Sequence, residues 1–339
     1  MRFPKVIALA VLAVLAACNN AGQSTSANGG SATISVRLPE SFVEFSLPSP
    51  DCQPSGIAAG SDGALWFTES ACDRIGRITV NGQITEFSVP TKNSVPFGIA
   101  AGPDGNVWFT ESAGNQIGVI TASGDISEYP IPTPSSGPVG IVAGGASMFF
   151  AESMGNQVAS IAVCGSSPTC STGTVTPLPE TATAIGPEAL AVDANGNLWA
   201  TERSGVVARD ASGVLTQYPV LSPTANDTYF IATGPDGNIW FTEQQGNAIS
   251  RVTLGGAIFV TEFTLPFPNS LPSAIVAGPD GNIWFTEGAG RIGRSTPSGF
   301  IKEFVPPTAT GQPYGIAAGP DGNVWFTERA SGKIGSIAP

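Results

Sequence analysis

Glutamates are the residues whose type and spacing first suggest chemistry in this chain of 339 residues. Seven of them close the copies of a repeat whose best versions read Gly-Pro-Asp-Gly-Asn-x-Trp-Phe-Thr-Glu, at intervals of 41 to 50 residues. They are Glu69, Glu111, Glu152, Glu202, Glu243, Glu287 and Glu328. A carboxylate can accept a proton as a general base or supply oxygen ligands to a divalent cation. Because every copy carries the same residue, we expect these glutamates to serve the repeat by accepting hydrogen bonds from backbone donors in neighbouring turns.

The chain contains no histidine. Catalysis by Ser-His-Asp or Cys-His groups and metal sites built on imidazole are therefore excluded. The recurrent Asp-Gly turns supply one carboxylate each, whereas a calcium loop needs several oxygen ligands, so we interpret them as turns. A lactonase-like site with a divalent ion held by Glu188, Glu287 and Glu328 stays open as an alternative, although their spacing shows no cluster.

The elements that must position these side chains follow from the repeat. A period of about 42 residues with one tight turn and several apolar runs is typical of four-stranded blades set around an axis. The sequence therefore predicts an all-β fold, a seven-bladed β-propeller of antiparallel blades over residues 40–339. In the second blade we expect strands at 98–102, 107–111, 117–121 and 126–130, with a Pro-Asp-Gly-Asn turn after the first.

The two ends of the propeller region complement one another. Residues 333–337 match a third strand without its outer partner, and residues 42–48 match the outer-strand pattern of residues 84–90. The N-terminal segment is therefore predicted to complete the last blade and close the ring, since unpaired blades would expose sheet edges. Six tryptophans at equivalent positions are predicted to pack between blades: Trp66, Trp108, Trp199, Trp240, Trp284 and Trp325.

The N-terminus has the pattern of an export signal. Two basic residues precede an apolar stretch of 12 residues, 6–17, which is too short for a helix that spans a bilayer. The stretch ends Leu-Ala-Ala-Cys, which resembles the bacterial lipoprotein processing box and implies that Cys18 becomes a diacylated N-terminus. An ordinary signal peptide with a chance cysteine is the alternative. We predict a lipoprotein signal peptide over 1–18, a flexible tether over 19–39, and an exported protein anchored by lipid in the cell envelope, on the periplasmic side of an outer membrane or at the cell surface.

Four further cysteines remain, an even number in an oxidising compartment. Cys164 and Cys170 bracket a short insertion in the one overlong repeat, and Cys52 and Cys72 flank the first repeat at the same end of its blade. We predict the disulfides Cys52–Cys72 and Cys164–Cys170. A zinc site is disfavoured, because the sequence has neither a CxxC pair nor a histidine.

The charge pattern limits the partners. The formal net charge is −12, and no run of lysine or arginine occurs. Binding of nucleic acid depends on clustered basic residues that neutralise phosphates, so we exclude it. We expect contact with a membrane only through the N-terminal lipid, and we expect a monomer.

The repeat, followed by Ile-Gly-x-Ile-Thr and an outer Ile-Thr-Glu-Phe-x-x-Pro, resembles the virginiamycin B lyase (streptogramin lyase) family over residues 42–339. The resemblance implies a seven-bladed propeller that linearises cyclic depsipeptide antibiotics by elimination, with magnesium (Mg2+) as its cofactor. In such a reaction a base removes the proton α to the ester carbonyl, and the metal stabilises the enolate that develops.

The site residues that the resemblance implies are changed in this chain. The family's catalytic histidines precede the inner-strand glycine of the last two blades, where this sequence has Ser273 and Tyr314. The family's catalytic glutamate matches Gln312, and only Glu328 is retained. By this resemblance Glu328 is the candidate base or metal ligand, and Tyr314 is the candidate hydrogen-bond donor to a developing oxyanion. A tyrosine is a poor base at neutral pH, because its ordinary pKa is about 10.

A second class of function is a ligand-binding or interaction module, since propellers present a concave face lined by variable loops. The residues that precede the inner strands are Ser55, Phe97, Val139, Glu188, Tyr229, Ser273 and Tyr314, with Asn226, Asp227 and Gln312 nearby. This mixture suits a small polar-aromatic molecule, a glycan or a peptide, and binding of such a ligand is the function we expect. The alternatives are a magnesium-dependent carbon–oxygen lyase that opens streptogramin B rings, a structural propeller in an envelope assembly, and a solvated face without a ligand.

Overall fold

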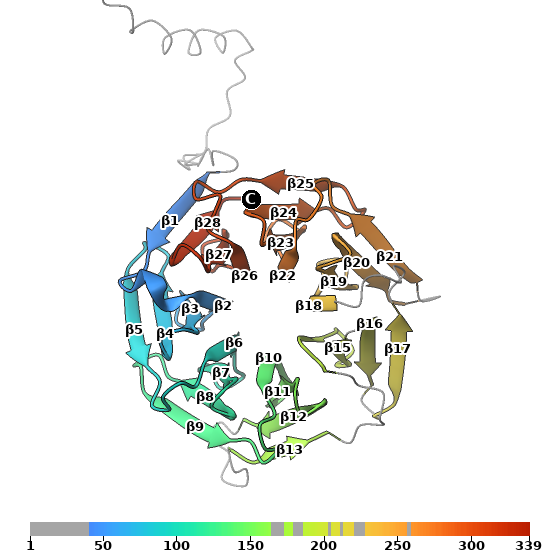
Figure 1. Ribbon diagram of the computed structural model, residues 1–339. Coiled ribbons are helices and arrows are strands. Elements are labelled where there is room, and N and C mark those ends of the chain that lie inside the picture. Colours follow the sequence, from blue (N-terminus) through green and yellow to red (C-terminus); the bar gives the residue numbers. More distant parts are fainter. Residues whose placement is uncertain are drawn as a thin grey trace, which may run out of the picture. The chain divides into compact units, whose positions relative to one another are not determined.

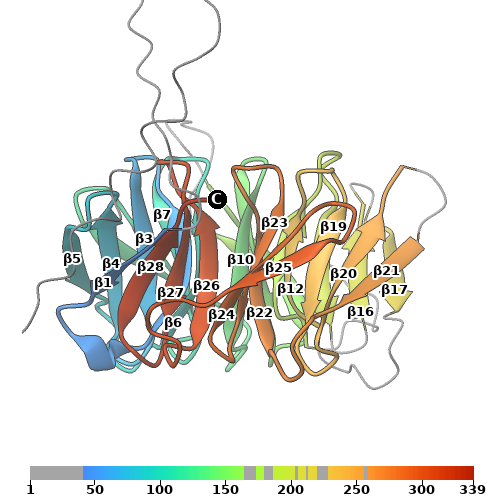
Figure 2. The same cartoon turned by 90° about the horizontal axis from the view of Figure 1, so that it is seen from above.

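Seven four-stranded antiparallel sheets form the protein in the computed structural model, which describes residues 41–163, 173–178, 186–202, 205–210, 213–219, 228–255 and 259–339. In Figure 1 the sheets stand as blades around a central axis, and in the side view of Figure 2 their strands run between two faces. The predicted all-β, seven-bladed propeller is confirmed. Within these ranges no helix is both long and apolar enough to cross a membrane.

Each blade runs from an inner strand at the axis to an outer strand at the rim (Figure 1). Blade 1 contains β2 (Pro54–Ala59), β3 (Ala64–Glu69), β4 (Arg74–Thr79) and β5 (Ile84–Ser88), and blade 2 contains β6 (Pro96–Ala101), β7 (Val107–Glu111), β8 (Gln116–Ile120) and β9 (Ile126–Pro130). Blade 3 contains β10 (Pro138–Gly144), β11 (Ser147–Glu152), β12 (Gln157–Ala162) and β13 (Val175–Pro177), and blade 4 contains β14 (Leu190–Val192), β15 (Leu198–Glu202), β16 (Gly205–Arg209) and β17 (Leu215–Pro219).

The remaining blades follow the same order. Blade 5 contains β18 (Thr228–Thr233), β19 (Ile239–Glu243), β20 (Ala248–Thr253) and β21 (Phe259–Thr264), and blade 6 contains β22 (Pro272–Ala277), β23 (Ile283–Glu287), β24 (Arg291–Ser295) and β25 (Ile301–Phe304). Blade 7 joins β26 (Pro313–Ala318), β27 (Val324–Glu328) and β28 (Lys333–Ile337) to β1 (Phe42–Ser46), and the short 3-10 helix η1 (Pro50–Cys52) follows β1.

Blade 2 shows why the repeat folds as it does. Its four strands lie within two residues of the predicted bounds. In the turn after β6, Gly105 adopts a φ of 82°, a left-handed conformation that glycine tolerates without strain. Oδ1 of Asp104 accepts a hydrogen bond from the Trp108 indole N–H at 3.1 Å. An aspartate–tryptophan bond of this kind recurs in all six blades that carry the tryptophan.

The tryptophans pack between blades, as predicted. Trp108 is fully buried and stacks on Tyr129 in the outer strand of its own blade, with ring centroids 5.8 Å apart. It shares a buried cluster with Met148 and Phe150 of blade 3. The other five tryptophans also stack on an outer-strand aromatic ring. The hydrophobic core is therefore a ring of clusters between blades, and this leaves the axis free for a cavity.

The N-terminal strand closes the ring, which confirms the predicted closure. β1 pairs antiparallel with β28 along all of its residues. Phe45 stacks on Trp325 with ring centroids 5.7 Å apart. Glu44 accepts hydrogen bonds from the Lys333 Nζ at 2.8 Å and from the Thr308 backbone N–H at 2.7 Å. The outer strand of the last blade thus comes from the other end of the propeller.

The predicted disulfide Cys52–Cys72 is present, with Cα atoms 5.0 Å apart, and it ties η1 to the turn that follows β3. The predicted pair Cys164–Cys170 lies outside the described residues. So do the signal peptide, Cys18 and the tether, and those predictions stay untested.

Candidate ligand-binding site in the central cavity

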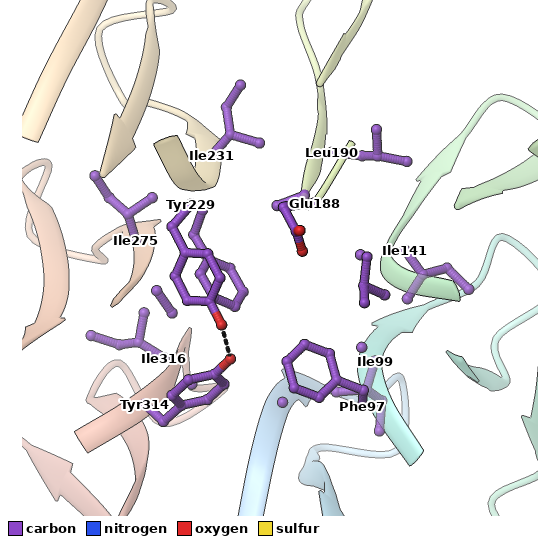
Figure 3. A pocket seen from close by; sticks show the side chains of 18 of the residues that line it. Phe97, Ile99, Ile141, Glu188, Leu190, Tyr229, Ile231, Ile275, Tyr314 and Ile316 are labelled. Atoms are coloured by element: carbon purple, nitrogen blue, oxygen red, sulfur yellow. Dashed lines mark hydrogen bonds between the residues drawn. The ribbon is translucent and has the colours of Figure 1, made fainter. Parts of the chain in front are cut away.

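A cavity of about 170 Å³ lies at the axis, where the inner strands of all seven blades converge (Figure 3). Every blade places an aliphatic residue in the lining at the same inner-strand position, namely Ile57, Ile99, Ile141, Leu190, Ile231, Ile275 and Ile316. The aromatic residues of the lining are Phe97, Tyr229, Phe230 and Tyr314, and Glu188 supplies a carboxylate. The cavity therefore combines an apolar wall with a few polar groups, as ligand sites usually do.

The threonine of the repeat motif fixes the inner strands in place. In blade 2, the Thr110 Oγ1 accepts a hydrogen bond from the Gly98 N–H at 2.9 Å and donates one to a carbonyl of blade 3 at 2.8 Å. Six blades are joined to the next one in this way, through Thr68, Thr110, Thr201, Thr242, Thr286 and Thr327. Three of the accepting carbonyls belong to Phe97, Tyr229 and Tyr314, so these threonines position the cavity residues.

Glycine allows the inner strands to approach one another this closely. A Cβ atom on Gly98 would lie 2.1 Å from the Val139 carbonyl oxygen, too close for any other residue. Blade 3 uses a different link, because Ala151 replaces the threonine. There the Gly140 N–H donates directly to the Glu188 carbonyl at 2.9 Å. The backbone that carries the cavity carboxylate is held by this bond.

Loss of one threonine link is expected to destabilise the fold measurably. Thr286→Ala should lower the free energy of unfolding by roughly 1–3 kcal/mol, because the Ala274 N–H and the Tyr314 carbonyl lose their common partner. Thr286→Ser keeps the hydroxyl and should cost only about 1 kcal/mol for the missing methyl group. Urea denaturation of the two variants tests this, and equal stabilities would contradict the linking role.

Two tyrosines from blades 5 and 7 meet across blade 6. The hydroxyl oxygens of Tyr229 and Tyr314 lie 2.5 Å apart and share a hydrogen bond, drawn as a dashed line in Figure 3. Phe97 packs edge-to-face against Tyr314 at 5.9 Å, and Phe230 packs against both tyrosines at 4.8 and 5.9 Å. Blade 6 places the small, buried Ser273 at the equivalent position, so no bulky side chain separates the tyrosines.

Tyr314 is held in its neutral form. Burial, together with the neighbouring Tyr229, raises the pKa of the Tyr314 phenol far above its usual range. The Arg329 guanidinium lies 5.1 Å from the centre of the Tyr314 ring and opposes the shift without cancelling it. Tyr314 can therefore donate a hydrogen bond to a ligand, but it cannot serve as a base near neutral pH.

Glu188 faces the two tyrosines from the other side of the cavity (Figure 3). Its Oε1 accepts a hydrogen bond from the Ser153 hydroxyl at 3.0 Å, and its side chain is partly exposed. Among the described residues that line the cavity there is no lysine or arginine. An ionised Glu188 therefore gives the lining a negative charge.

Four of the predicted binding-face residues line the cavity together: Phe97, Glu188, Tyr229 and Tyr314. Two do not: Ser273 is only 2% exposed, and Gln312 is exposed in the turn before β26 with a φ of 54°. Asn226 and Asp227 lie outside the described residues. Phe230 was not predicted, although one signal was available. It stands where the inner strands of the other blades have glycine or alanine.

The repeat glutamates do not line the cavity within the described structure, and all seven are at most 1% exposed. The expectation that they accept hydrogen bonds from the backbone is wrong for Glu69, whose two carboxyl oxygens have no hydrogen-bond partner in the described part of the chain. Glu243 and Glu328 instead accept from the hydroxyls of Ser250 and Ser331, at 2.5 and 2.7 Å. Such burial favours the protonated form of a carboxyl group.

Glu328, the candidate base and metal ligand, illustrates the consequence. Burial raises the pKa of its carboxyl group to about 7, although the Ser331 hydroxyl opposes the shift. Magnesium prefers ionised oxygen ligands. Among the described residues no group of three or more acidic or cysteine side chains is arranged to hold a metal ion. Glu328, buried and with a raised pKa, is therefore a poor ligand for the magnesium that the family resemblance implies.

Comparison with known proteins places the fold and the repeat in one family. The model of the virginiamycin B lyase family matches residues 35–169 and 169–339. The chain belongs to the virginiamycin B lyase family. The family recognised from the sequence is thus confirmed, and this member of it has no histidine.

Solved structures agree with this assignment. A streptogramin B lyase structure is 34% identical, with a TM-score of 0.80 over 88% of this chain and 97% of that chain. A catalytically inactive histidine-to-alanine variant of virginiamycin B lyase from Staphylococcus aureus, with quinupristin, is 32% identical, with a TM-score of 0.79 over 88% of this chain and 99% of that chain. Hydrazine synthase from Kuenenia stuttgartiensis shares 16% identity, with a TM-score of 0.69 over 86% of this chain and 97% of that chain, and shows a common fold only.

Proposed function

We propose that this virginiamycin B lyase family member is a binding module that holds part of a small molecule, a glycan or a peptide in its central cavity and does not open streptogramin rings. The observation that carries the proposal is the lining, in which four aromatic side chains and one carboxylate converge. The positions that match the family's histidines hold a buried serine and a neutral tyrosine. The catalytic inactivity of a relative with one histidine changed to alanine supports the loss of chemistry.

We also propose that the module is exported and anchored by lipid. The support is the leader, whose short apolar stretch ends in the lipoprotein-like box at Cys18. The polar segment 19–39 would give the propeller reach from the membrane. Incorporation of a labelled fatty acid into the chain, and its loss in Cys18→Ser, checks the anchor.

The binding function is tested with defined probes. The purified protein is incubated with quinupristin and magnesium, and mass spectrometry is used to look for a ring-opened product. A panel of oligosaccharides, short peptides and small aromatic molecules is screened in parallel by calorimetry. We expect no ring opening, and we expect any ligand found to lose at least about 100-fold in affinity in the double variant Tyr229→Ala/Tyr314→Ala, since both rings form the wall.

The control is a variant that changes an exposed group, Asp51→Asn, which should bind normally. Retained secondary structure and a cooperative melting transition would show that the double variant is folded. Ring-opened quinupristin would overturn the proposal, and a ligand that binds the double variant as tightly as the native protein would place the site elsewhere.

One observation favours a second candidate, a carbon–oxygen lyase of the family type. A carboxyl group with a pKa of about 7, such as that of Glu328, is well matched to proton transfer near neutral pH. Against it, Glu328 is fully buried and is not among the cavity residues. If quinupristin were opened in a magnesium-dependent manner, loss of turnover in Glu328→Gln would assign the base.

A further inference from the structure

We propose that the central cavity recognises a compact organic cation, the ammonium head group of a larger ligand, held between the aromatic rings and the Glu188 carboxylate. The inference rests on the proposed binding function of this cavity and names the chemical class that the lining selects. The size of the cavity, the orientation of its rings and its charge each carry part of the argument.

The cavity has room for a head group only. Its volume is about 170 Å³. An apolar cavity of about 150 Å³ admits a benzene molecule, whereas pockets for drug-sized ligands measure about 300–1,000 Å³. A group with roughly the bulk of a trimethylammonium or a benzene ring fits. The rest of the ligand would lie outside the cavity.

Four aromatic rings line the cavity and stand at steep angles to one another. The planes of Tyr229 and Tyr314 make an angle of 75°, those of Phe97 and Tyr314 an angle of 72°, and those of Tyr229 and Phe230 an angle of 88°. In each of these pairs the edge of one ring meets the face of its neighbour, so the rings form a corner rather than a flat stack at the cavity wall. Aromatic faces carry negative potential and attract cations, which is how aromatic cages bind quaternary ammonium groups.

The charge of the lining selects a cation over a neutral or anionic group. Glu188 is the one carboxylic acid among the described lining residues, and it faces Tyr229 and Tyr314 across the cavity (Figure 3). A neutral ligand gains no charge attraction from this carboxylate, whereas a cation placed beside it does. An anionic ligand would also be repelled by the carboxylate. An ammonium group is attracted both by the carboxylate and by the aromatic ring faces.

One positive group near the site acts against a cationic ligand. The Arg329 guanidinium lies 5.1 Å from the centre of the Tyr314 ring and is not among the cavity residues. It already makes a cation–π contact with the Tyr314 ring, and it adds a positive charge close to the cavity lining. Removal of this charge is therefore expected to tighten the binding of a cation, whereas it would weaken the binding of an anion.

Choline and its neutral isostere 3,3-dimethylbutan-1-ol provide a matched test, because the two differ only in the charge of the quaternary atom. Calorimetry with the full-length protein should show that choline binds at least about tenfold more tightly than the alcohol. Glu188→Gln should remove most of this preference, and Arg329→Gln should strengthen choline binding about two- to fivefold. Asp51→Asn, an equal change of charge at an exposed position, should leave the preference unchanged.

Each outcome bears on one of the two proposals. Equal affinities for choline and the alcohol, or a preference that survives Glu188→Gln, would overturn cation recognition. If choline fails to bind while another probe binds in the cavity and loses affinity in Tyr229→Ala/Tyr314→Ala, cation recognition is wrong and the binding function stands. If Glu188→Gln does not fold, Tyr229→Leu serves instead, since it removes a ring face and should reduce the preference for the cation.

Discussion

The propeller is expected to lose stability as the pH rises from about 5 to about 9, with a fall in melting temperature of about 10 °C. The cause is the set of buried glutamates that end the second strand of the blades. Burial raises the pKa of the Glu69 and Glu111 carboxyls to about 8, and that of Glu287 and Glu328 to about 7. At Glu69 the nearby Glu86 carboxylate adds to the effect.

The sign follows from where the protons are bound. In the unfolded chain these carboxyls titrate near 4.5, so between that pH and about 8 the native state holds protons that the unfolded state has released. Their contribution to stability is complete below about 4.5 and is lost as the pH rises through about 7 and 8. One pKa unit corresponds to about 1.4 kcal/mol, so even a fraction of these four shifts amounts to several kcal/mol.

Some turn aspartates change the stability with pH in the opposite direction, but they titrate below the pH range of this test. Burial raises the pKa of the turn aspartates Asp62 and Asp280, but hydrogen bonds from side chains and backbone outweigh it and lower the pKa below 3.8. Their stabilisation is present above that value and is lost only in more acidic solution. Between about pH 5 and 9 the glutamates should therefore dominate the dependence.

Thermal melting of matched variants distinguishes this cause from general charge repulsion. Glu69→Gln and Glu111→Gln replace a buried acid by a neutral side chain of the same shape, so each should flatten the pH profile and melt higher than the native protein at about pH 9. Asp51→Asn removes the same charge from an exposed position and should keep the native slope. A native protein that becomes more stable from pH 5 to 9 would contradict the argument.

The sequence was sufficient for the blades because their determinants are local and repeated. The Asp-Gly turn, the tryptophan and the strand spacing lie within one repeat, and the outer-strand pattern before Leu47 identified the closing strand. The threonine link was not predicted, although Thr110 stands beside the equally regular Glu111. Its donor and acceptor belong to two different blades, and no spacing within one repeat shows that a side chain joins them.

The cavity could be predicted only in part, for a related reason. The ring of residues before the inner strands identified Phe97, Glu188, Tyr229 and Tyr314, since the closure of the propeller brings these positions together. The contact between two of them, 85 residues apart, depends on the small Ser273 of the blade in between. Whether a side chain at such a position turns toward the axis or into the blade depends on packing, which the sequence does not show.

Removal of residues 40–48 is expected to lower the free energy of unfolding by at least about 5 kcal/mol. The deletion takes away β1, the stack of Phe45 on Trp325, and the side chain of Leu47, which is only 4% exposed. It also exposes the edge of β28, an edge that could pair with another chain.

Urea denaturation measures the loss of stability, and light scattering detects association between chains. A truncation of 19–39 alone is the control, and an unchanged melting temperature after deletion of 40–48 would contradict the closure.

A pair of point variants isolates the closure from ordinary packing. Phe45 and Phe87 make equivalent stacks on Trp325 and Trp66, each with ring centroids 5.7 Å apart. Phe87 lies in β5, which a tight hairpin joins to β4, so this strand stays tethered when its ring is removed. β1 has no such hairpin to β28, and non-covalent contacts alone hold the two strands together. Phe45→Ala should therefore speed amide hydrogen exchange in β28 at least about tenfold, whereas Phe87→Ala should leave exchange in β4 nearly unchanged. Similar acceleration in both strands would mean that the propeller opens no more easily between β1 and β28 than at its other blades.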